Sequence, residues 1–243
     1  MFLNTAVQPF SMGDYKVLSG RQIRPEFLTD ESKILTADPS DVLFLAFPET
    51  IEHLEEIVSD AYGEEIPVRI QGARSGLTSG CVPRKGKDGR QEAVIATDNL
   101  LAVPHSHYYD TETKRVKTVL HDREITYGFN KETGEIILPA GATLNERRIL
   151  LDGHGRLFPI NPTHQDATIA GNIKTNATGL EGAFGSTRDW TIRLGQILGN
   201  GERYDAIRGH PMNNPSHVYL NLGGTILTVD MPTYEWRPVK NAS

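Results

Sequence analysis

Two stretches of this chain are poor in large apolar side chains, and they constrain how it can fold. Residues 159–185 contain only five such side chains: Ile160, Ile169, Ile173, Leu180 and Phe184. Residues 72–80 hold three glycines and three hydroxyl side chains. A core forms by burying apolar surface, so neither stretch can build one by itself. We therefore expect both to line a ligand that two subdomains hold between them.

Regular elements are predicted on either side of residues 72–80, the first of the two stretches in chain order. Residues 42–48 and 66–70 favour strands, and residues 51–61 carry apolar side chains at the three- and four-residue spacing of a helix. Thr50 is a suitable N-cap for this helix and Gly63 a suitable end. Strand, helix and strand in succession predict a parallel pair joined by a crossover. A third strand is expected over residues 93–96.

The second half of the chain favours antiparallel pairing. A charged region with turn signals, residues 105–134, predicts a hairpin, and residues 136–139 favour a strand. A short helix is expected over residues 145–151, ending at Gly153 or Gly155. Strands return at residues 191–198 and 224–230, with a hairpin turn at residues 200–201 (Asn-Gly). The predicted class is α+β, with one subdomain over residues 1–102 and a second over residues 103–243.

The first small-residue stretch has the composition of a diphosphate-binding loop. Glycines at 72, 76 and 80 permit the positive φ angles with which backbone N–H groups converge on one anion. Ser75, Thr78 and Ser79 add hydroxyl donors. The stretch is neither a G-x-G-x-x-G fingerprint nor a phosphate loop ending in Gly-Lys-Ser/Thr, which disfavours those two sites. The alternative is a glycine-rich surface loop.

The second stretch combines two prolines with threonines, asparagines and glycines, which indicates a rigid backbone presenting amides and hydroxyls. Groups of this kind recognise a flavin ring and its ribityl chain, because the ring nitrogens and oxygens need fixed donors and acceptors. An irregular loop is the alternative. His164, Lys174 and Arg188 could contact the ligand, although loop hydrogen bonds or ion pairs are at least as good an interpretation.

Composition excludes several other functions. A net charge of −6 without a basic stripe argues against nucleic acid binding. The single cysteine, Cys81, excludes an intramolecular disulfide and favours a buried thiol. The histidine pairs His105/His107 and His210/His217 lack the spacing of metal ligands, so we expect no metal site. No leader pattern and no membrane-length apolar run occur, which predicts a soluble, cytoplasmic protein.

Several motifs in order resemble one enzyme family. These are Gly-Ala-Arg-Ser-Gly-Leu-Thr at 72–78, Ala-Gly-Ala-Thr-Leu at 140–144, Pro-x-x-Pro-Thr at 159–163, Ala-Thr-Ile-x-Gly-Asn at 167–172, Thr-Asn-Ala-x-Gly at 175–179 and Gly-x-Thr-Arg-Asp at 185–189. The pattern is similar to the FAD-linked oxidases of the vanillyl-alcohol-oxidase, or p-cresol-methylhydroxylase (PCMH), type. Within it, the D-lactate dehydrogenase, glycolate oxidase and D-2-hydroxyglutarate dehydrogenase branch is the most similar.

The resemblance implies a PCMH-type FAD-binding fold: two α/β subdomains, first a small parallel sheet and then a larger, mainly antiparallel one, with FAD between them. It also implies a set of cofactor-binding residues: Gly72, Ala73, Arg74, Ser75, Gly76, Leu77, Thr78, Pro162, Thr163, Thr168, Gly171, Asn172, Thr175, Asn176, Ala177, Thr178, Gly224, Thr225 and Ile226. The chain departs from the family pattern at Ala170, Gly223 and Leu227. No histidine lies between residues 71 and 83, so we expect non-covalent FAD, with Cys81 as a remote alternative for attachment.

The resemblance further implies hydride transfer from a 2-hydroxyacid or similar alcohol to flavin N5, with electrons passing on to a partner protein or a quinone. No catalytic residue is identifiable. Because the sequence ends at Ser243 without a substrate domain, we expect another subunit, a cap-domain chain or a homo-oligomer to cover the flavin. Two alternatives stay open: a non-catalytic subunit that stabilises a related catalytic chain, and the FAD subunit of a molybdenum hydroxylase.

Overall fold

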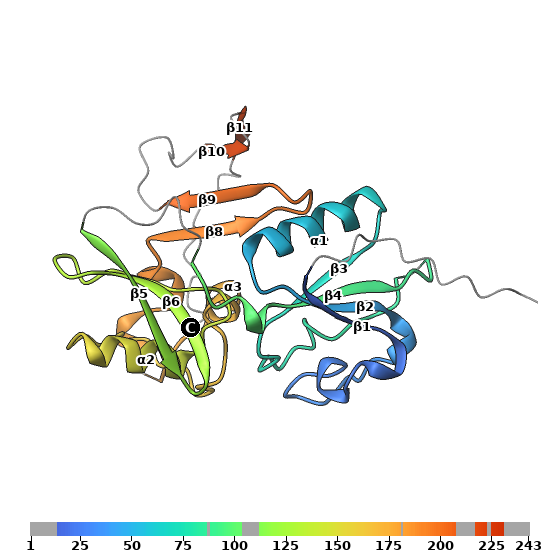
Figure 1. The fold of residues 1–243 in the computed structure, drawn as a ribbon, viewed down its shortest axis with the longest axis horizontal. Helices are drawn as coiled ribbons and strands as arrows, with labels where there is room; N and C mark the ends of the chain where they lie inside the picture. Colours follow the sequence, from blue (N-terminus) through green and yellow to red (C-terminus); the bar gives the residue numbers. More distant parts are fainter. Residues whose placement is uncertain are drawn as a thin grey trace, which may run out of the picture.

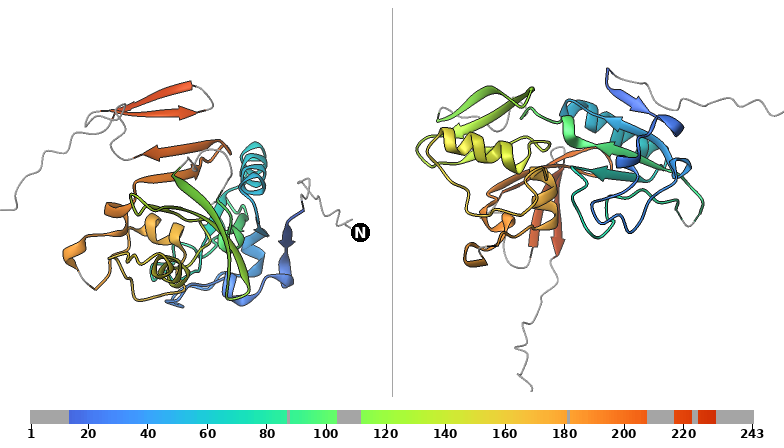
Figure 2. Two further views of the ribbon diagram at one scale, coloured as in Figure 1. Left: turned by 60° about the vertical axis from the view of Figure 1, so that its left-hand side comes forward. Right: turned by 90° about the horizontal axis from the view of Figure 1, so that it is seen from below.

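The computed structural model describes residues 14–86, 88–103, 112–180, 182–207, 217–222 and 225–230, the last two ranges as backbone alone. Figure 1 shows two parts side by side, one built on strands β1–β4 with helix α1 and the other on β5–β7 with helices α2 and α3. The view from below in Figure 2 again places these parts next to one another. No helix among the described residues is long and apolar enough to cross a membrane.

The first part contains a four-stranded sheet. Its strands are β1 (Lys16–Leu18), β2 (Val42–Phe47), β3 (Val68–Gln71) and β4 (Glu92–Ala96), in the order β1-β2-β4-β3. Strands β2 and β3 both run parallel to β4, whereas β1 is antiparallel to β2. The three predicted strands are confirmed. The expectation that β2 and β3 pair with each other is wrong, because β4 lies between them. Every residue of β4 is buried, so it takes the centre, and β3, with Ile70 half exposed, takes the edge.

Helix α1 (Ile51–Gly63) confirms the predicted crossover helix. The hydroxyl of Thr50 accepts a hydrogen bond from the His53 N–H at 3.2 Å and caps the helix. The side chains expected to be buried, Leu54, Ile57, Val58 and Ala61, are buried, and most of them pack on one face of the sheet. The other face is covered by Ile23, Phe27 and Leu28 from the segment between β1 and β2.

The second part begins with the predicted hairpin, β5 (Thr113–Leu120) and β6 (Arg123–Asn130), followed by the short β7 (Ile136–Ile137). His121 and Asp122 form the turn, with φ of 51° and 62°. Helix α2 (Leu144–Gly153) is the predicted second helix, capped by Thr143. Its buried side chains Leu150 and Leu151 pack against Ile125, Tyr127 and Phe129 of β6.

Helix α3 (Ile169–Thr175) was not predicted, because its small residues show no periodic apolar face. Residues at its two ends stabilise this helix. The Thr168 hydroxyl accepts from the Gly171 N–H at 3.3 Å, and Asn176 terminates the helix in the left-handed conformation with φ 53°. Short 3-10 helices occupy Gly20–Gln22, Pro25–Phe27, Pro39–Asp41, Thr97–Asn99, Gly182–Phe184 and Thr187–Trp190.

Two further antiparallel ladders complete the described fold: β8 (Arg193–Ile197) with β9 (Arg203–Ile207), and β10 (His217–Leu222) with β11 (Thr225–Asp230). They confirm the predicted strands over 191–198 and 224–230 and the hairpin at 200–201. The β8–β9 hairpin lies beside α1 (Figure 1), where Arg203 pairs with Glu52 and Glu55. The α+β class is confirmed, with separate antiparallel ladders in the described part of the second half, while the division at residue 102 stays a prediction.

Candidate cofactor site

The loop at residues 72–80 leaves the C-terminal end of β3, next to the residues that follow β4. No backbone N–H of residues 73–78 donates a hydrogen bond to any described residue. The Leu77 side chain is 65% exposed, and a Cβ added at Gly76 would meet nothing within 4 Å. Residues 76–78 are exposed, so water can satisfy their N–H groups in the absence of a ligand. This run of N–H groups without a protein partner is therefore open to a ligand.

The turns of this loop do not come from its glycines, as the sequence predicted. Positive φ angles occur at Arg74 (60°) and Ser79 (56°), whereas Gly72, Gly76 and Gly80 lie outside that region. The prediction that the glycines supply the left-handed conformations is therefore wrong. Gly72 is needed for space, because a Cβ there would lie 2.3 Å from the Thr168 hydroxyl oxygen.

Both ends of the loop are held by buried polar groups. Gln71 is fully buried, and its side-chain amide donates to the carbonyls of Phe27 at 2.9 Å and Cys81 at 2.8 Å. The Asp30 carboxylate accepts from the Ser79 N–H at 2.7 Å. Hydrogen bonds, first of all from the Ser32 hydroxyl and also from the Ser79 N–H, hold the pKa of Asp30 below its usual value. The loop is thus fixed at its start and its end.

The second small-residue stretch approaches the first through the beginning of α3. Thr168 forms a bridge with Thr143, and the Ile169 N–H donates to the Ala142 carbonyl at 2.7 Å. These contacts bring the Thr168 side chain against Gly72. The two stretches that were expected to lie together therefore meet at this point.

Several side chains of the second stretch make hydrogen bonds within it. The buried Asn172 amide donates to the Thr168 carbonyl at 2.9 Å, and the Thr175 hydroxyl donates to the Gly171 carbonyl at 2.9 Å. The Asn176 side-chain oxygen accepts from the Arg188 N–H at 3.1 Å. These bonds stabilise α3 and its ends. The backbone N–H groups of residues 169–172, 176 and 177 are bonded within the protein as well.

The remaining candidate residues lie around this segment. Thr163 is exposed, and the Pro162 carbonyl accepts from the Gln165 side chain at 2.7 Å. Ala177 accepts through its carbonyl from the N–H of Thr187, and Thr178 bridges to Ser186. Thr225 and Ile226 open strand β11, and Gly224 lies outside the described residues, as does Gly223.

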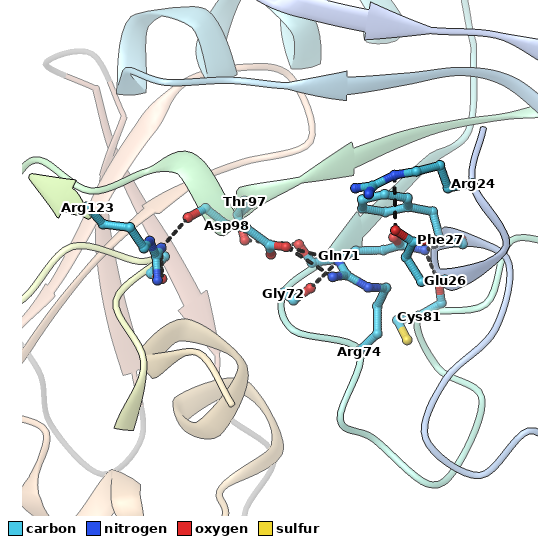
Figure 3. Close-up of polar contacts among 11 residues, drawn as sticks. Arg24, Glu26, Phe27, Gln71, Gly72, Arg74, Cys81, Thr97, Asp98 and Arg123 are labelled. Carbon is cyan, nitrogen blue, oxygen red and sulfur yellow. Dashed lines mark hydrogen bonds and ion pairs between the residues drawn. The ribbon is translucent and has the colours of Figure 1, made fainter. Parts of the chain in front are cut away.

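A chain of charged groups, missed by the sequence analysis, runs from the loop to α2. Figure 3 shows its part from Arg74 through Asp98 to Arg123. The Arg74 guanidinium binds the Asp98 carboxylate at 3.1 Å, Arg123 donates to the Asp98 carbonyl at 2.7 Å, and Arg123 pairs with the buried Glu146 at 2.9 Å. Burial raises the pKa of Asp98, and Arg74 offsets this in part. An acidic residue two positions after a buried parallel strand was the available signal for this network.

The other polar candidates have local roles. The Arg188 guanidinium donates to the carbonyls of Ile173 at 2.8 Å and Lys174 at 2.6 Å, at the end of α3. Burial raises the pKa of the Cys81 thiol, which opposes thiolate formation. The described residues contain no group of three metal-ligating side chains.

The histidine pairs fall largely beyond what the structure describes. His105, His107 and His210 lie outside the described part of the chain. His217 begins strand β10, where only the backbone is described. The expectation that neither pair binds a metal therefore stays a prediction.

Comparison with solved structures gives the fold class. Cholesterol oxidase from B. sterolicum superimposes over 82% of this chain and 34% of its own, with a TM-score of 0.54 and 15% identity. At that identity the likeness establishes the fold alone, in agreement with the α+β class.

Sequence comparison identifies the family. Residues 42–206 match the FAD binding domain family, and the chain belongs to it. D-lactate dehydrogenase from Anaerostipes hadrus is 27% identical over 188 residues, which cover 77% of this chain and 33% of that protein. D-2-hydroxyglutarate dehydrogenase from Xanthomonas citri pv. viticola is 27% identical over 182 residues, covering 74% and 33%. This chain thus spans about a third of the length of these relatives.

Proposed function

We propose that this chain binds FAD between residues 72–78 and residues 162–178, as the cofactor-binding part of a flavin-dependent oxidoreductase. The observation that supports it most is the run of unpaired N–H groups at residues 73–78, next to the contact between Gly72 and Thr168. A diphosphate is the part of FAD that needs several donors converging on one place. The family match supports FAD over other dinucleotides.

The residues present fit such a group. The loop offers backbone donors, and its fixed ends keep them in place without a ligand, which reduces the ordering cost of binding. The proposed contacts come from residues 72–78 and from Pro162, Thr163, Thr168, Gly171, Asn172, Thr175, Asn176, Ala177 and Thr178, together with Gly224, Thr225 and Ile226. In the second stretch many backbone N–H groups and the side chains of Asn172 and Thr175 are already bonded within the protein, so we assign the contacts there to the polar atoms that these bonds leave over.

We assign the substrate to the 2-hydroxyacids or similar alcohols, because the D-lactate and D-2-hydroxyglutarate dehydrogenases are relatives in sequence. Bound FAD supplies the hydride acceptor at its N5 atom. The proposed role of this chain is to bind and orient the cofactor without a covalent bond to it. Electrons would then leave for a partner protein or a quinone.

A partner surface at the C-terminal end of the second stretch is part of the proposal. Leu180 is 91% exposed, Phe184 46% and Trp190 48%, which are high values for large apolar side chains close together in sequence. Exposed apolar patches mark interaction sites. A cap-type domain or a second subunit would cover these side chains and, at the same time, the reactive face of the flavin.

Titration calorimetry of FAD, FMN and riboflavin into the apoprotein tests the cofactor proposal. We expect FAD to bind with one-to-one stoichiometry and at least tenfold more tightly than riboflavin, which has no phosphate. Denaturation should release the flavin intact. No heat with FAD, or equal affinity for FAD and riboflavin, would refute the proposed diphosphate site.

Anaerobic addition of D-lactate, glycolate or D-2-hydroxyglutarate to the FAD complex then separates the two functional classes. Bleaching of the oxidised flavin band by one of these acids would establish the dehydrogenase. A chain that binds FAD but is bleached by none of them, alone or with its partner subunit, would instead be a non-catalytic subunit.

A further inference from the structure

We propose that the Arg74 side chain does not contact the cofactor, and that Arg74 and Asp98 act together as positioning residues that fix the diphosphate loop, residues 72–80, in its binding conformation. The inference deepens the proposed function, since its affinity measurement requires FAD binding. An arginine in a phosphate-binding loop would ordinarily be assigned to the phosphate itself. In this protein its contacts point to a different role.

The guanidinium of Arg74 already makes three hydrogen bonds within the protein. Nη1 donates to the Gly72 carbonyl at 2.8 Å and to the Asp98 carboxylate at 3.1 Å, and Nη2 donates to the same carboxylate oxygen at 3.1 Å. Its Cζ atom lies over the Phe27 ring, 4.5 Å from the ring centre. Only 16% of the side chain is exposed. Figure 3 shows Arg74 between Gly72 and Asp98.

The backbone of Arg74 also needs support. With φ at 60°, it occupies the left-handed region, which a side chain with a Cβ adopts at a cost. The Arg74 carbonyl accepts from the Glu31 N–H at 3.0 Å, and the side chain closes back onto the Gly72 carbonyl. Backbone dihedrals at residue 74 set the direction of the N–H groups that follow. Relaxation of this residue would therefore change the direction of the N–H groups of residues 75–78.

Asp98 is itself held in place by neighbouring residues. Its carbonyl accepts from Arg123, which also donates to the Gly141 carbonyl at 3.1 Å and pairs with Glu146. The second carboxylate oxygen of Asp98 is buried without a partner, so among the described residues only Arg74 donates to this side chain. If Arg74 moved to a phosphate, it would leave this carboxylate, which is 31% exposed and has one buried oxygen, without its cation, which is unfavourable.

A double-mutant cycle on FAD affinity tests the inference with Arg74→Met, Asp98→Asn and the double variant. Each single substitution should weaken FAD binding about tenfold, a typical coupling between contacting residues. The double variant should bind no more weakly than the weaker single variant. If Arg74 instead binds phosphate, Asp98→Asn leaves FAD affinity unchanged or raises it, and only Arg74→Met weakens it. That pattern would overturn the proposal.

Asp205→Asn provides a matched control. It breaks the Arg193–Asp205 ion pair, whose side chains are 32% and 31% exposed, in the β8–β9 hairpin rather than in the loop. This variant should bind FAD like the wild type. A loss equal to that of Asp98→Asn would mean that general destabilisation explains both, and would refute the positioning role.

Amide hydrogen exchange in the apoprotein gives a second measurement that does not need FAD. The Ser79 amide lies in the loop and donates to the Asp30 carboxylate outside it. Asp98→Asn should speed the exchange of this amide, while Asp205→Asn should leave it unchanged. Failure of the wild type to bind FAD would refute the proposed function, and the exchange result would still decide on the positioning role. Unchanged exchange at Ser79 in Asp98→Asn would refute that role in either case.

Discussion

Gly72→Ala tests the contact between the two small-residue stretches. The added Cβ would lie 2.3 Å from the Thr168 hydroxyl oxygen, closer than such atoms can approach, so Thr168 must move. Forcing a methyl group into a packed contact costs about 1–3 kcal/mol. Rotation of Thr168 would also break its bond to the Gly171 N–H, and loss of an N-cap costs about 1 kcal/mol. We therefore expect a loss of about 2–3 kcal/mol in the free energy of unfolding.

Urea denaturation of the apoprotein measures this loss, with Gly76→Ala as the matched control. The control adds the same methyl group four residues further on, where it meets nothing within 4 Å, and should change stability by less than about 1 kcal/mol. In a Thr168→Ala background, Gly72→Ala should become nearly neutral, because the obstructing hydroxyl is gone. Equal effects of the two glycine substitutions in the wild-type background would show that the stretches do not meet as described.

Three further substitutions probe charges elsewhere in the fold. Burial, with two neighbouring carboxylates, raises the pKa of Asp60 above its ordinary 3.8, so ionisation destabilises the folded state as pH rises through that range. Asp60→Asn should therefore raise the free energy of unfolding at pH 7 and not at pH 3, and a loss at pH 7 would contradict this. Arg203→Met removes the pairing with Glu55 and should cost about 0.5–1 kcal/mol in low salt and less in 1 M salt. A cost independent of salt would indicate packing instead. Glu146→Gln keeps the helix cap but removes the charge opposite Arg123, with an expected loss of about 2 kcal/mol by denaturation, and a neutral result would exclude an ion pair of structural importance.

The regular elements of the first part could be predicted because each carries its own signal. The period of Leu54, Ile57, Val58 and Ala61 identifies α1, and the apolar runs identify β2 and β4. The insertion of β4 between β2 and β3 was not predictable from these local patterns, since strand order depends on which strand is buried on both sides. Helix α3 was not predicted from the sequence, because capping residues rather than a periodic apolar face define it.

For the candidate site, the sequence located the two stretches but misjudged how they work. Glycine at position 72 reads equally well as a source of positive φ or as a small residue, and only the contact with Thr168 distinguishes the two. Left-handed φ at Arg74 and Ser79 goes against the local preference and results from tertiary bonds to Asp98 and Asp30. The Asp98 position after a buried strand was a weak signal for the first of these bonds, whereas the bond between Ser79 and Asp30 has no local sequence signal.

Amide hydrogen exchange of residues 73–78, with and without FAD, tests the central claim most directly. The account predicts that these amides, unpaired in the apoprotein, become protected when FAD binds and stay unprotected with riboflavin. Saturating FAD that leaves all of them exchanging at the apoprotein rate would contradict the claim that this loop binds the cofactor's diphosphate.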